Sequence, residues 1–471
     1  MSVSILDFQE NCSPSIADLK FKSSFYNLFF EAEKKDILFN THRGVLIEIT
    51  PELRIALQEN HFADIPEDLT KTLQEMGFLV PVGYDELAEY LQRYENSKEQ
   101  GGALSLKLFM ATSCNLGCPY CYQSAPTKPG NVIKKEQLDS LLKWIEWECR
   151  ESGITALRLE FYGGEPLLAR LLMPGFMNRL NDVCHKYAVP VEYEIITNAT
   201  LMDDTIIDLF VKNRVQMQIT LDGDKEKHDQ RRAWKTTGKG SFEQIFDNLE
   251  KICARGAGDL VRLRINVDQN NINDVKPLAE KAHRLGIKSF MCGRIHFREK
   301  KTDYDTNMIS TEQFDENFDL EIFKILQPLG FADSPASLDS KDTCLYHWKK
   351  GFSVSPSLDL FKCDELIDNP EYCVGHIGVD GIPVYNQVEY EKAVSRKPTD
   401  FEHCSTCRYL PQCGSGCSIR ALNGKGTPHL NFCEATYDSV KRKVTSYVRA
   451  EEQGLISNRS DGGCQNCNCS K

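Results

Sequence analysis

Residues 104–121 read LSLKLFMATSCNLGCPYC and join a candidate strand to a cysteine cluster. The strand spans Leu104 to Ala111, and Cys114, Cys118 and Cys121 follow it in the spacing CxxxCxxC. Three thiolates on one loop can converge on a single metal centre, and thiolate ligands select zinc or iron-sulfur clusters. This stretch therefore predicts a strand that ends in a metal site.

The number of ligands separates the two kinds of metal site. A structural zinc ion takes four ligands, usually as two separated pairs, whereas this loop offers three cysteines and no nearby histidine. Three ligands leave one iron of a 4Fe-4S cube without a protein ligand, and a chelating small molecule could bind there. A zinc site, or three unrelated thiols, remains the alternative.

Strand-type and helix-type runs alternate from residue 103 to about residue 295. The later candidate strands are Ala156–Tyr162, Val191–Thr197, Val215–Leu221, Val261–Val267 and Lys288–Met291, and Ile133–Cys149 and Phe242–Arg255 are among the helix-type runs between them. Six βα units predict an α/β fold with a parallel sheet and right-handed crossovers. Six units, where a closed barrel has eight, favour a partial (β/α)6 TIM-like barrel, with its chemistry at the ends of the strands.

Further motifs follow the ends of the next three strands. They read Gly163-Gly164-Glu165-Pro166, Thr197-Asn198-Ala199 and Thr220-Leu221-Asp222-Gly223, and HDQRR follows at residues 228–232. The two glycines let the backbone approach a ligand closely, and Glu165 can accept hydrogen bonds from an ammonium group.

In order and position, these motifs resemble the radical S-adenosylmethionine (SAM) superfamily. The resemblance implies that Cys114, Cys118 and Cys121 hold a 4Fe-4S cluster whose open iron binds the amino and carboxylate groups of SAM. Reductive cleavage of SAM would then give a 5′-deoxyadenosyl radical, which abstracts hydrogen from the substrate. The implied SAM contacts are Tyr120, Gly163, Gly164, Glu165, Asn198, Thr220 and Arg232, with Arg264 as the alternative to Arg232. Ala199 departs from the family pattern, because relatives usually have glycine there.

Composition narrows the possible partners and location. The chain has 471 residues and a net charge of -12, which would repel nucleic acid. Its first thirty residues lack an apolar signal segment, and no later stretch approaches the length of a membrane span. We therefore expect a cytoplasmic protein that binds neither nucleic acid nor membrane. Nineteen cysteines in such a chain point to metal sites rather than to a disulfide scaffold.

A second cysteine cluster lies near the C-terminus. Cys404, Cys407, Cys413 and Cys417 follow C-x2-C-x5-C-x3-C, with Cys433 downstream and Cys344 and Cys363 upstream. One or two structural zinc sites are the alternative on the residues alone. The spacing resembles the SPASM extension of radical SAM enzymes, which carries two auxiliary 4Fe-4S clusters.

The SPASM resemblance implies two ligand sets. Cys404, Cys407, Cys413 and Cys433 would hold the distal cluster, and Cys344, Cys363 and Cys417 the nearer one. Cys373 is either the fourth ligand of the nearer cluster or a buried thiol. If it is not a ligand, the open iron could take a thiolate from the substrate. Leu358 departs from the family pattern, which has glycine five residues before the second upstream cysteine, so the nearer loop could differ in shape.

The N-terminal region predicts a small winged-helix-like module. Strands are expected at residues 25–30, 37–40 and 45–49, helical stretches after Pro51 and Pro66 and again at residues 85–93, and a linker at residues 95–102. The module resembles the precursor-recognition domain fused to radical SAM enzymes that modify ribosomal peptides. That resemblance implies that a leader peptide binds as an added strand. A domain that only braces the barrel is the alternative.

Together these resemblances imply an enzyme that modifies a ribosomally synthesised precursor peptide, with Cys thioether cross-links as the leading reaction. Carbon-carbon cross-linking and epimerisation use the same radical chemistry, as does sulfatase maturation, although those maturases generally lack such an N-terminal module. A non-catalytic iron-sulfur scaffold that binds a peptide is a further alternative. The implied cofactors are three 4Fe-4S clusters and SAM. The implied partners are a precursor peptide and an electron donor such as flavodoxin or ferredoxin.

The expected domain map has five parts. They are the peptide-recognition module at 1–100, the barrel at 101–300, a bridging region at 301–340, the SPASM domain at 341–450 and a cysteine-rich tail at 451–471. The tail, with Cys464, Cys467 and Cys469, is expected to be either a mobile end or a segment that reaches the open iron.

Overall fold

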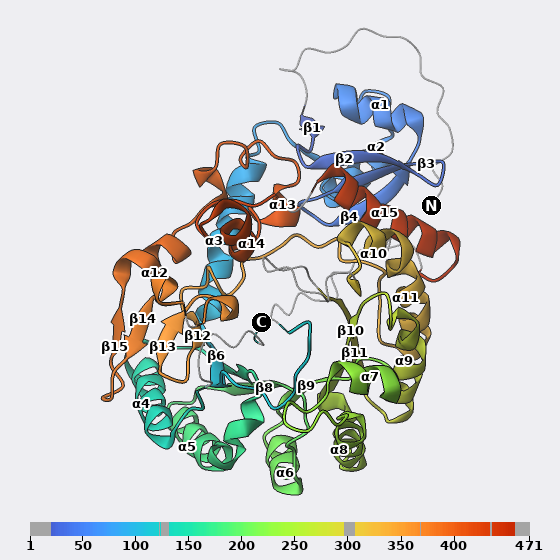
Figure 1. The fold of residues 1–471 in the computed structure, drawn as a ribbon. Coiled ribbons are helices and arrows are strands. Elements are labelled where there is room, and N and C mark those ends of the chain that lie inside the picture. The colour runs from blue at the N-terminus through green and yellow to red at the C-terminus, as the bar shows by residue number, and fades with distance from the viewer. Residues whose placement is uncertain are drawn as a thin grey trace.

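The computed structural model describes residues 20–121, 123, 131–295, 307–367, 369–433 and 436–456. Its centre is a ten-stranded sheet in the order β11-β10-β9-β8-β7-β6-β12-β13-β14-β15, curved so that helices cover its outer side (Figure 1). None of the described helices is long and apolar enough to cross a membrane.

Six strands of this sheet run parallel and follow one another in sequence. They are β6 (Leu104–Ala111), β7 (Leu157–Gly163), β8 (Val191–Thr197), β9 (Gln216–Thr220), β10 (Val261–Val267) and β11 (Ser289–Arg294). The intervening helices are α4 (Lys135–Glu151), α5 (Met173–Lys186), α6 (Asp204–Lys212), α7 (Lys225–Arg231), α8 (Phe242–Ala254) and α9 (Val275–Arg284). All six predicted strands are present, and the predicted α/β fold with a parallel sheet is confirmed.

Side chains alternate between the two faces of these strands. Leu104 and Leu106 of β6 are buried in the main core, whereas Ser105 and Lys107 line a cavity on the inner face. Strand β7 repeats the pattern, because Arg158 and other polar residues alternate with its buried leucines. The inside of the curved sheet is therefore polar, and the apolar core lies between the strands and their helices.

The cysteine-rich region extends the same sheet. Strand β12 (Gly351–Val354) pairs in parallel with β6, and β13 (Asp359–Phe361), β14 (Gly375–Ile377) and β15 (Pro383–Tyr385) continue in antiparallel order. Strand pairing therefore ties this region to the barrel sheet. Strands of three or four residues are too short to show periodicity in a sequence.

The turn between β12 and β13 contains the departure from the family pattern. Leu358 has φ +69°, in the left-handed region that glycine adopts freely and other residues rarely enter. The Ser355 hydroxyl accepts hydrogen bonds from the amides of Ser357 and Asp359 at 3.2 and 3.0 Å. The turn thus has the backbone conformation expected of glycine, and Leu358 is buried in the main core.

The N-terminal module contains a three-stranded antiparallel sheet. Strands β2 (Asn27–Ala32), β3 (Lys35–Asn40) and β4 (Val45–Ile49) form it, as expected from the sequence. Helices α1 (Pro51–Glu59) and α2 (Glu67–Glu75) follow, and β1 (Phe21–Ser23) pairs with β5 (Leu79–Pro81). Apolar side chains from α1, α2 and one face of the sheet form a separate core.

The opposite face of this sheet is covered by the far end of the chain. Helix α15 (Tyr437–Glu452) lies against β2 (Figure 1). Its Val440, Val444 and Tyr447 pack in one core with Leu28 and Phe30 of β2. The remaining helices are α10 (Thr311–Asn317), α11 (Asp319–Leu326), α12 (Gln387–Val394), α13 (Leu410–Cys413) and α14 (Ser418–Lys425). One face of the N-terminal sheet is thus covered by a helix that follows both the barrel and the cysteine-rich region in the sequence.

The expected linker at residues 95–102 is wrong, because helix α3 (Glu86–Glu99) runs through most of it. Lys98 is fully buried, and its ammonium donates hydrogen bonds at 2.9 Å to Glu95 and to the carbonyl oxygens of Val394 and Arg396. The polar residues at 95–102 suggested an exposed segment. In the structure, the Lys98 ammonium instead satisfies buried backbone carbonyls at the end of α12. Helix α3 therefore joins the module to the cysteine-rich region.

We predict that Lys98→Met lowers the free energy of unfolding by about 3 kcal/mol, because two buried carbonyls and Glu95 lose their donor. Equilibrium denaturation checks this. Lys71→Met on α2, whose side chain is 76% exposed, is the matched control and leaves the midpoint unchanged. Equal midpoints for the two variants would show that Lys98 does not fasten α3.

Candidate functional site

A cavity of about 360 Å³ lies at the carboxyl ends of the parallel strands. This volume falls in the range of small-molecule pockets, about 300–1,000 Å³. Nearly all of the predicted cofactor-binding residues lie in its wall. They are Cys114, Cys118, Tyr120, Cys121, Gly163, Gly164, Asn198, Thr220, Arg232 and Arg264.

The cysteine loop is held by the segment that follows α7. Leu116 forms an antiparallel bridge with Trp234, and the Gly117 amide donates to the Ala233 carbonyl at 2.9 Å. The Lys235 amide donates to the Asn115 carbonyl at the same distance. The loop is therefore anchored on both sides of Leu116, between the first and second cysteines.

Burial controls the protonation of the loop thiols. It raises the pKa of Cys114 to about 12, with a further contribution from Glu165, and it also raises the pKa of Cys118. Metal ligands are thiolates, so a positive centre would have to displace these protons.

Gly163 and Gly164 bring the end of β7 against the backbone that precedes Cys114. A Cβ on Gly164 would lie 2.2 Å from the Ser113 carbonyl oxygen, and one on Gly163 would lie 2.0 Å from that of Ala111. The amide of Gly164 donates to the Ala111 carbonyl at 2.9 Å. The glycines line the cavity, but the close approach that requires them is to protein backbone.

Glu165 lies beneath the cavity and not in its wall. Its side chain is fully buried and accepts hydrogen bonds from the amides of Leu167 and Asn198 at 2.9 and 2.8 Å, and from the Thr197 hydroxyl at 2.6 Å. These donors differ from the ligand ammonium expected from the sequence. In the structure, the carboxylate ties the end of β7 to the end of β8.

Asn198 also makes its contacts within the protein. Its amide nitrogen lies 2.9 Å from Asn115 Oδ1 and 3.7 Å from Cys114 Sγ, and its Oδ1 accepts from the Thr200 hydroxyl at 2.6 Å. Thr220, at the end of β9, is buried and lies in the cavity wall. Asn198 thus orients the first cysteine.

Tyr120 is fixed by a buried ion pair. Its hydroxyl donates to Asp222, and Arg232 Nη1 donates to that hydroxyl at 2.7 Å. Arg232 and Asp222 lie 3.6 Å apart and are both buried. Burial raises the pKa of Asp222, but Arg232 and Arg231 outweigh it and hold the pKa below its usual value. The aromatic residue beside the third cysteine is therefore held in one orientation.

Asp222, Asn266 and Asn115 also belong to the site, although their side chains were not predicted to act there. The Asn266 amide donates to Asp222 Oδ1 at 2.9 Å, and its side chain lines the cavity. Asp222 and Asn115 lie within motifs that the sequence already singled out, so their position near the site could have been predicted. Asn266 carried no local signal, because only the parallel pairing of β9 and β10 brings it to the site.

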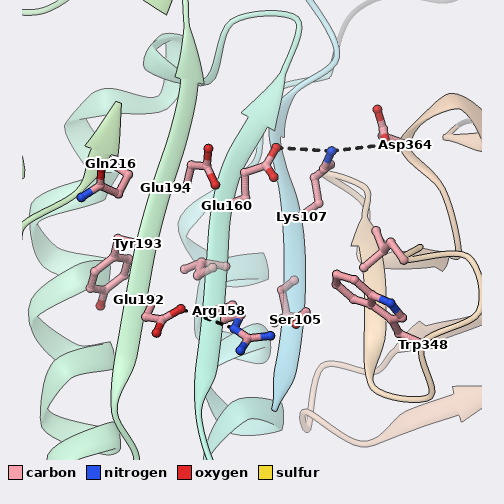
Figure 2. Close-up of a pocket in the computed structure, with 13 residues that line it drawn as sticks. Ser105, Lys107, Arg158, Glu160, Glu192, Tyr193, Glu194, Gln216, Trp348 and Asp364 are labelled. Carbon is pink, nitrogen blue, oxygen red and sulfur yellow. Dashed lines mark hydrogen bonds and ion pairs between the residues drawn. The ribbon is translucent and has the colours of Figure 1, made fainter. Parts of the chain in front are cut away.

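A second cavity, of about 350 Å³, is lined by residues of β6, β7 and β8 that precede the strand ends (Figure 2). Lys107 reaches across it and lies 3.4 Å from both Glu160 and Asp364. Asp364 directly follows Cys363, so Lys107 connects β6 to the cysteine-rich region. Burial raises the pKa of Glu160 to about 7 against the opposing effect of Lys107, and Glu194 and Asp364 add to the rise.

The cysteines of the nearer predicted set come together around one small core. Cys363, Cys373 and Cys417 pack on the cluster formed by Tyr346, Phe361 and their neighbours. The pKa of Cys363 is raised by burial and by Asp364, and Cys344 adds to the rise. The thiol of Cys373 donates to the Gly375 carbonyl at 3.1 Å.

The distal set forms a separate group. Burial raises the pKa of Cys413 to about 11, and Cys407 and Cys404 add to the rise. Burial also raises the pKa of Cys404, to which Cys407 and Cys433 contribute. Cys404 and Cys407 pack against Tyr90 and Tyr94 of α3. The predicted tail cysteines 464, 467 and 469 lie outside the described residues.

Several features of the cavity at the carboxyl ends of the strands, hereafter the upper cavity, fit a 4Fe-4S cluster with SAM. Three thiols share one wall, and Arg232 Nε is buried there without a hydrogen-bond partner. Within the described chain, no three His, Cys, Asp or Glu side chains gather at the separation that a single metal ion needs. Cys114, Cys118 and Cys121 would hold the cluster, and the strand-end residues would surround SAM.

Comparison with known proteins identifies the same region. Residues 108–282 match the model of the Radical SAM superfamily. The antilisterial bacteriocin subtilosin biosynthesis protein AlbA of Bacillus subtilis is 25% identical over 332 residues, 68% of each chain. A cysteine-type anaerobic sulfatase-maturating enzyme of Clostridium novyi is 25% identical over 373 residues, 73% of this chain and 96% of its own.

A solved structure shares the fold. Native anSMEcpe with bound AdoMet superposes with a TM-score of 0.56 and 19% identity, over 74% of this chain and 99% of that one. The likeness extends over most of the described chain and confirms the α/β architecture around the cavity.

We predict that Gly164→Ala greatly weakens SAM binding, because its Cβ would push the β7 loop away from Ser113. Isothermal titration of anaerobically purified protein measures this, and we expect a loss of at least tenfold. Gly175→Ala in α5 is the matched control, since a Cβ there meets nothing within 4 Å. Normal affinity in Gly164→Ala would contradict the packing argument.

We predict a pH-dependent stability difference at Glu160. The raised pKa means that the folded protein releases this proton at higher pH than the unfolded chain, so wild-type stability falls as pH rises from about 5 to 8. Glu160→Gln has no proton to release here. Its free energy of unfolding, relative to that of wild type, should therefore increase by about 2 kcal/mol over that pH range. Denaturant titrations at several pH values test it, with exposed Glu151→Gln as control. Parallel profiles for wild type and Glu160→Gln would contradict it.

Proposed function

We propose that this member of the radical SAM superfamily modifies a ribosomally made precursor peptide and closes a thioether bond between a cysteine sulfur and a peptide carbon. The observation that carries the proposal is the grouping of Cys114, Cys118 and Cys121 with the strand-end motifs around one cavity. The relation to a bacteriocin biosynthesis protein supports a peptide substrate.

The cysteine-rich region supports the sulfur chemistry. Two groups of thiols, one around Cys363 and Cys417 and one around Cys404 and Cys413, are available for two auxiliary 4Fe-4S clusters. When bound, the clusters and SAM would supply the 5′-deoxyadenosyl radical that removes a hydrogen atom from the peptide carbon, and the acceptor for the electron released as sulfur closes the bond.

The chain's own residues would position these groups and exclude water. Asn198 orients Cys114, and the Asp222–Arg232 pair orients Tyr120. Glu165 holds the ends of β7 and β8 together beneath the cavity. Because this network is already hydrogen-bonded within the protein, little reorganisation would accompany cofactor binding.

The N-terminal module supports recognition of a leader peptide. In the described chain, the outer strands β2 and β4 pair only with β3. An extended peptide can add to such an edge through backbone hydrogen bonds. The leader would then bind apart from the residues that react.

Sulfatase maturation is the second candidate. The match to the Clostridium novyi maturase covers 96% of that enzyme, more than the match to AlbA covers of its own chain. The N-terminal module favours a peptide with a leader. The product of the peptide substrate would separate the two candidates. A thioether bond blocks one cysteine thiol for each two hydrogens that the peptide loses.

We predict that reconstituted protein contains roughly twelve iron atoms per chain, as three 4Fe-4S clusters require, and about eight after Cys114, Cys118 and Cys121 are changed to Ala. Reduced wild-type protein should form 5′-deoxyadenosine from SAM, and the triple variant should form none. A wild-type content near four would remove the auxiliary clusters from the proposal. Absence of 5′-deoxyadenosine would favour the non-catalytic scaffold.

We predict that co-expression with a peptide encoded beside this gene gives a product lighter by two hydrogens, with one thiol blocked to alkylation per event. Mass spectrometry measures both. An unchanged mass with a D-residue would indicate epimerisation, and two lost hydrogens with all thiols free would indicate carbon-carbon cross-linking. The triple cysteine variant is the control.

A further inference from the structure

Five lysine or arginine side chains are buried in the described part of the chain. Three of them meet a carboxylate: Lys98 pairs with Glu95, Arg231 with Asp268 and Arg232 with Asp222. The other two, Lys362 and Arg396, form no ion pair with any described residue. Both lie beside the predicted auxiliary-cluster cysteines.

Lys362 directly precedes Cys363 and is 1% exposed. Its ammonium donates to the carbonyl oxygens of Trp348 and Gly351, the latter at 2.6 Å. It also lies 4.5 Å from the ring centre of Phe352. Carbonyl dipoles and an aromatic face stabilise a cation, but they do not neutralise it.

Arg396 lies next to the loop that carries Cys413 and Cys417. Its Nη1 donates to the Ser418 hydroxyl at 2.8 Å, and its Nη2 donates to the Ser415 carbonyl at 2.8 Å. Its Nε is buried without a hydrogen-bond partner. Ser415 lies between Cys413 of the distal set and Cys417 of the nearer set, so the guanidinium borders the loop that serves both sets.

A buried charge without a counter-charge is strongly unfavourable, and proteins pair or neutralise such groups. The paired state of Lys98, Arg231 and Arg232 shows that this chain follows the rule elsewhere. A cluster ligated by several thiolates carries net negative charge. It would supply the counter-charge that Lys362 and Arg396 lack.

We propose that Lys362 and Arg396 are fixed counter-charges of the auxiliary 4Fe-4S clusters and raise their reduction potentials, so that the clusters can accept the electron released by the substrate. Lys362, which precedes Cys363, would serve the nearer cluster, and Arg396, which contacts the loop that carries Cys413 and Cys417, would act on both. The inference rests on the auxiliary clusters of the proposed function. In this role the two cations act on the clusters through their charge and do not contact the substrate.

The direction of the effect follows from electrostatics. One-electron reduction makes a cluster more negative, so a nearby buried cation stabilises the reduced form more than the oxidised form. The effect is strong in a dry interior and weak where water screens the charge. Removing either cation should therefore make the cluster harder to reduce.

The experiment is a potentiometric EPR titration of reconstituted full-length protein that carries Cys114→Ala, Cys118→Ala and Cys121→Ala, so that only auxiliary clusters contribute. Arg396→Gln and Lys362→Met remove the charges, and Arg396→Lys keeps one. Lys397→Gln is the matched control, because it removes a solvent-exposed charge one residue away.

We expect Arg396→Gln and Lys362→Met each to lower the equilibrium constant for one-electron reduction at least tenfold, which is about 59 mV. Arg396→Lys and Lys397→Gln should stay within twofold of the parent. Loss of iron from Arg396→Gln with normal iron in Arg396→Lys would also support the proposal, since charge alone would then decide cluster binding.

Two results would overturn the inference, and they can be told apart. Normal iron with unchanged potentials in both neutral variants would show that the cations have another role and leave the proposed function intact. Equal loss of iron from Arg396→Gln and Arg396→Lys would likewise indicate a structural role. A parent protein without auxiliary iron would instead refute the clusters themselves.

Discussion

Where β6 ends, the backbone of residues 111–113 lies directly against Gly163 and Gly164 of the neighbouring strand. The contact is made by hydrogen bonds at 2.9 Å from Gly164 to Ala111 and from Glu165 to Ser113, which carry the β6–β7 pairing into the loops. It aligns the cysteine loop with the ends of the next strands. Glu165 then transmits the alignment to β8, so the part of the cavity wall formed by the ends of β6, β7 and β8 depends on this pairing.

Much of the barrel and its site could be predicted from the sequence. Strands β6 to β10 begin and end within a residue or two of their expected positions, because five to eight residues of alternating pattern suffice to mark a strand. The site residues follow strand ends, and parallel pairing brings strand ends together. The motif glycines were expected for closeness to a ligand, whereas the contact that requires them is to the backbone before Cys114.

What could not be predicted depends on contacts between distant parts of the chain. The buried position of Lys98 requires the carbonyl oxygens of Val394 and Arg396, and nothing near Lys98 in the sequence reveals them. Strands β12 to β15 are individually too short to recognise. The sequence does not reveal that Lys362 and Arg396 are buried without a carboxylate partner, because both the burial and the neighbours depend on the fold.

The covering of the N-terminal sheet by α15 has a consequence for synthesis on the ribosome. The β2 face that receives Val440, Val444 and Tyr447 remains bare until roughly 400 further residues have been added, which takes about 20 to 80 seconds at typical elongation rates. During that interval an apolar sheet face and both its edges are open to other nascent chains. Translation speed and chaperone supply, rather than the stability of the finished protein, would then limit the yield of folded protein in a foreign host.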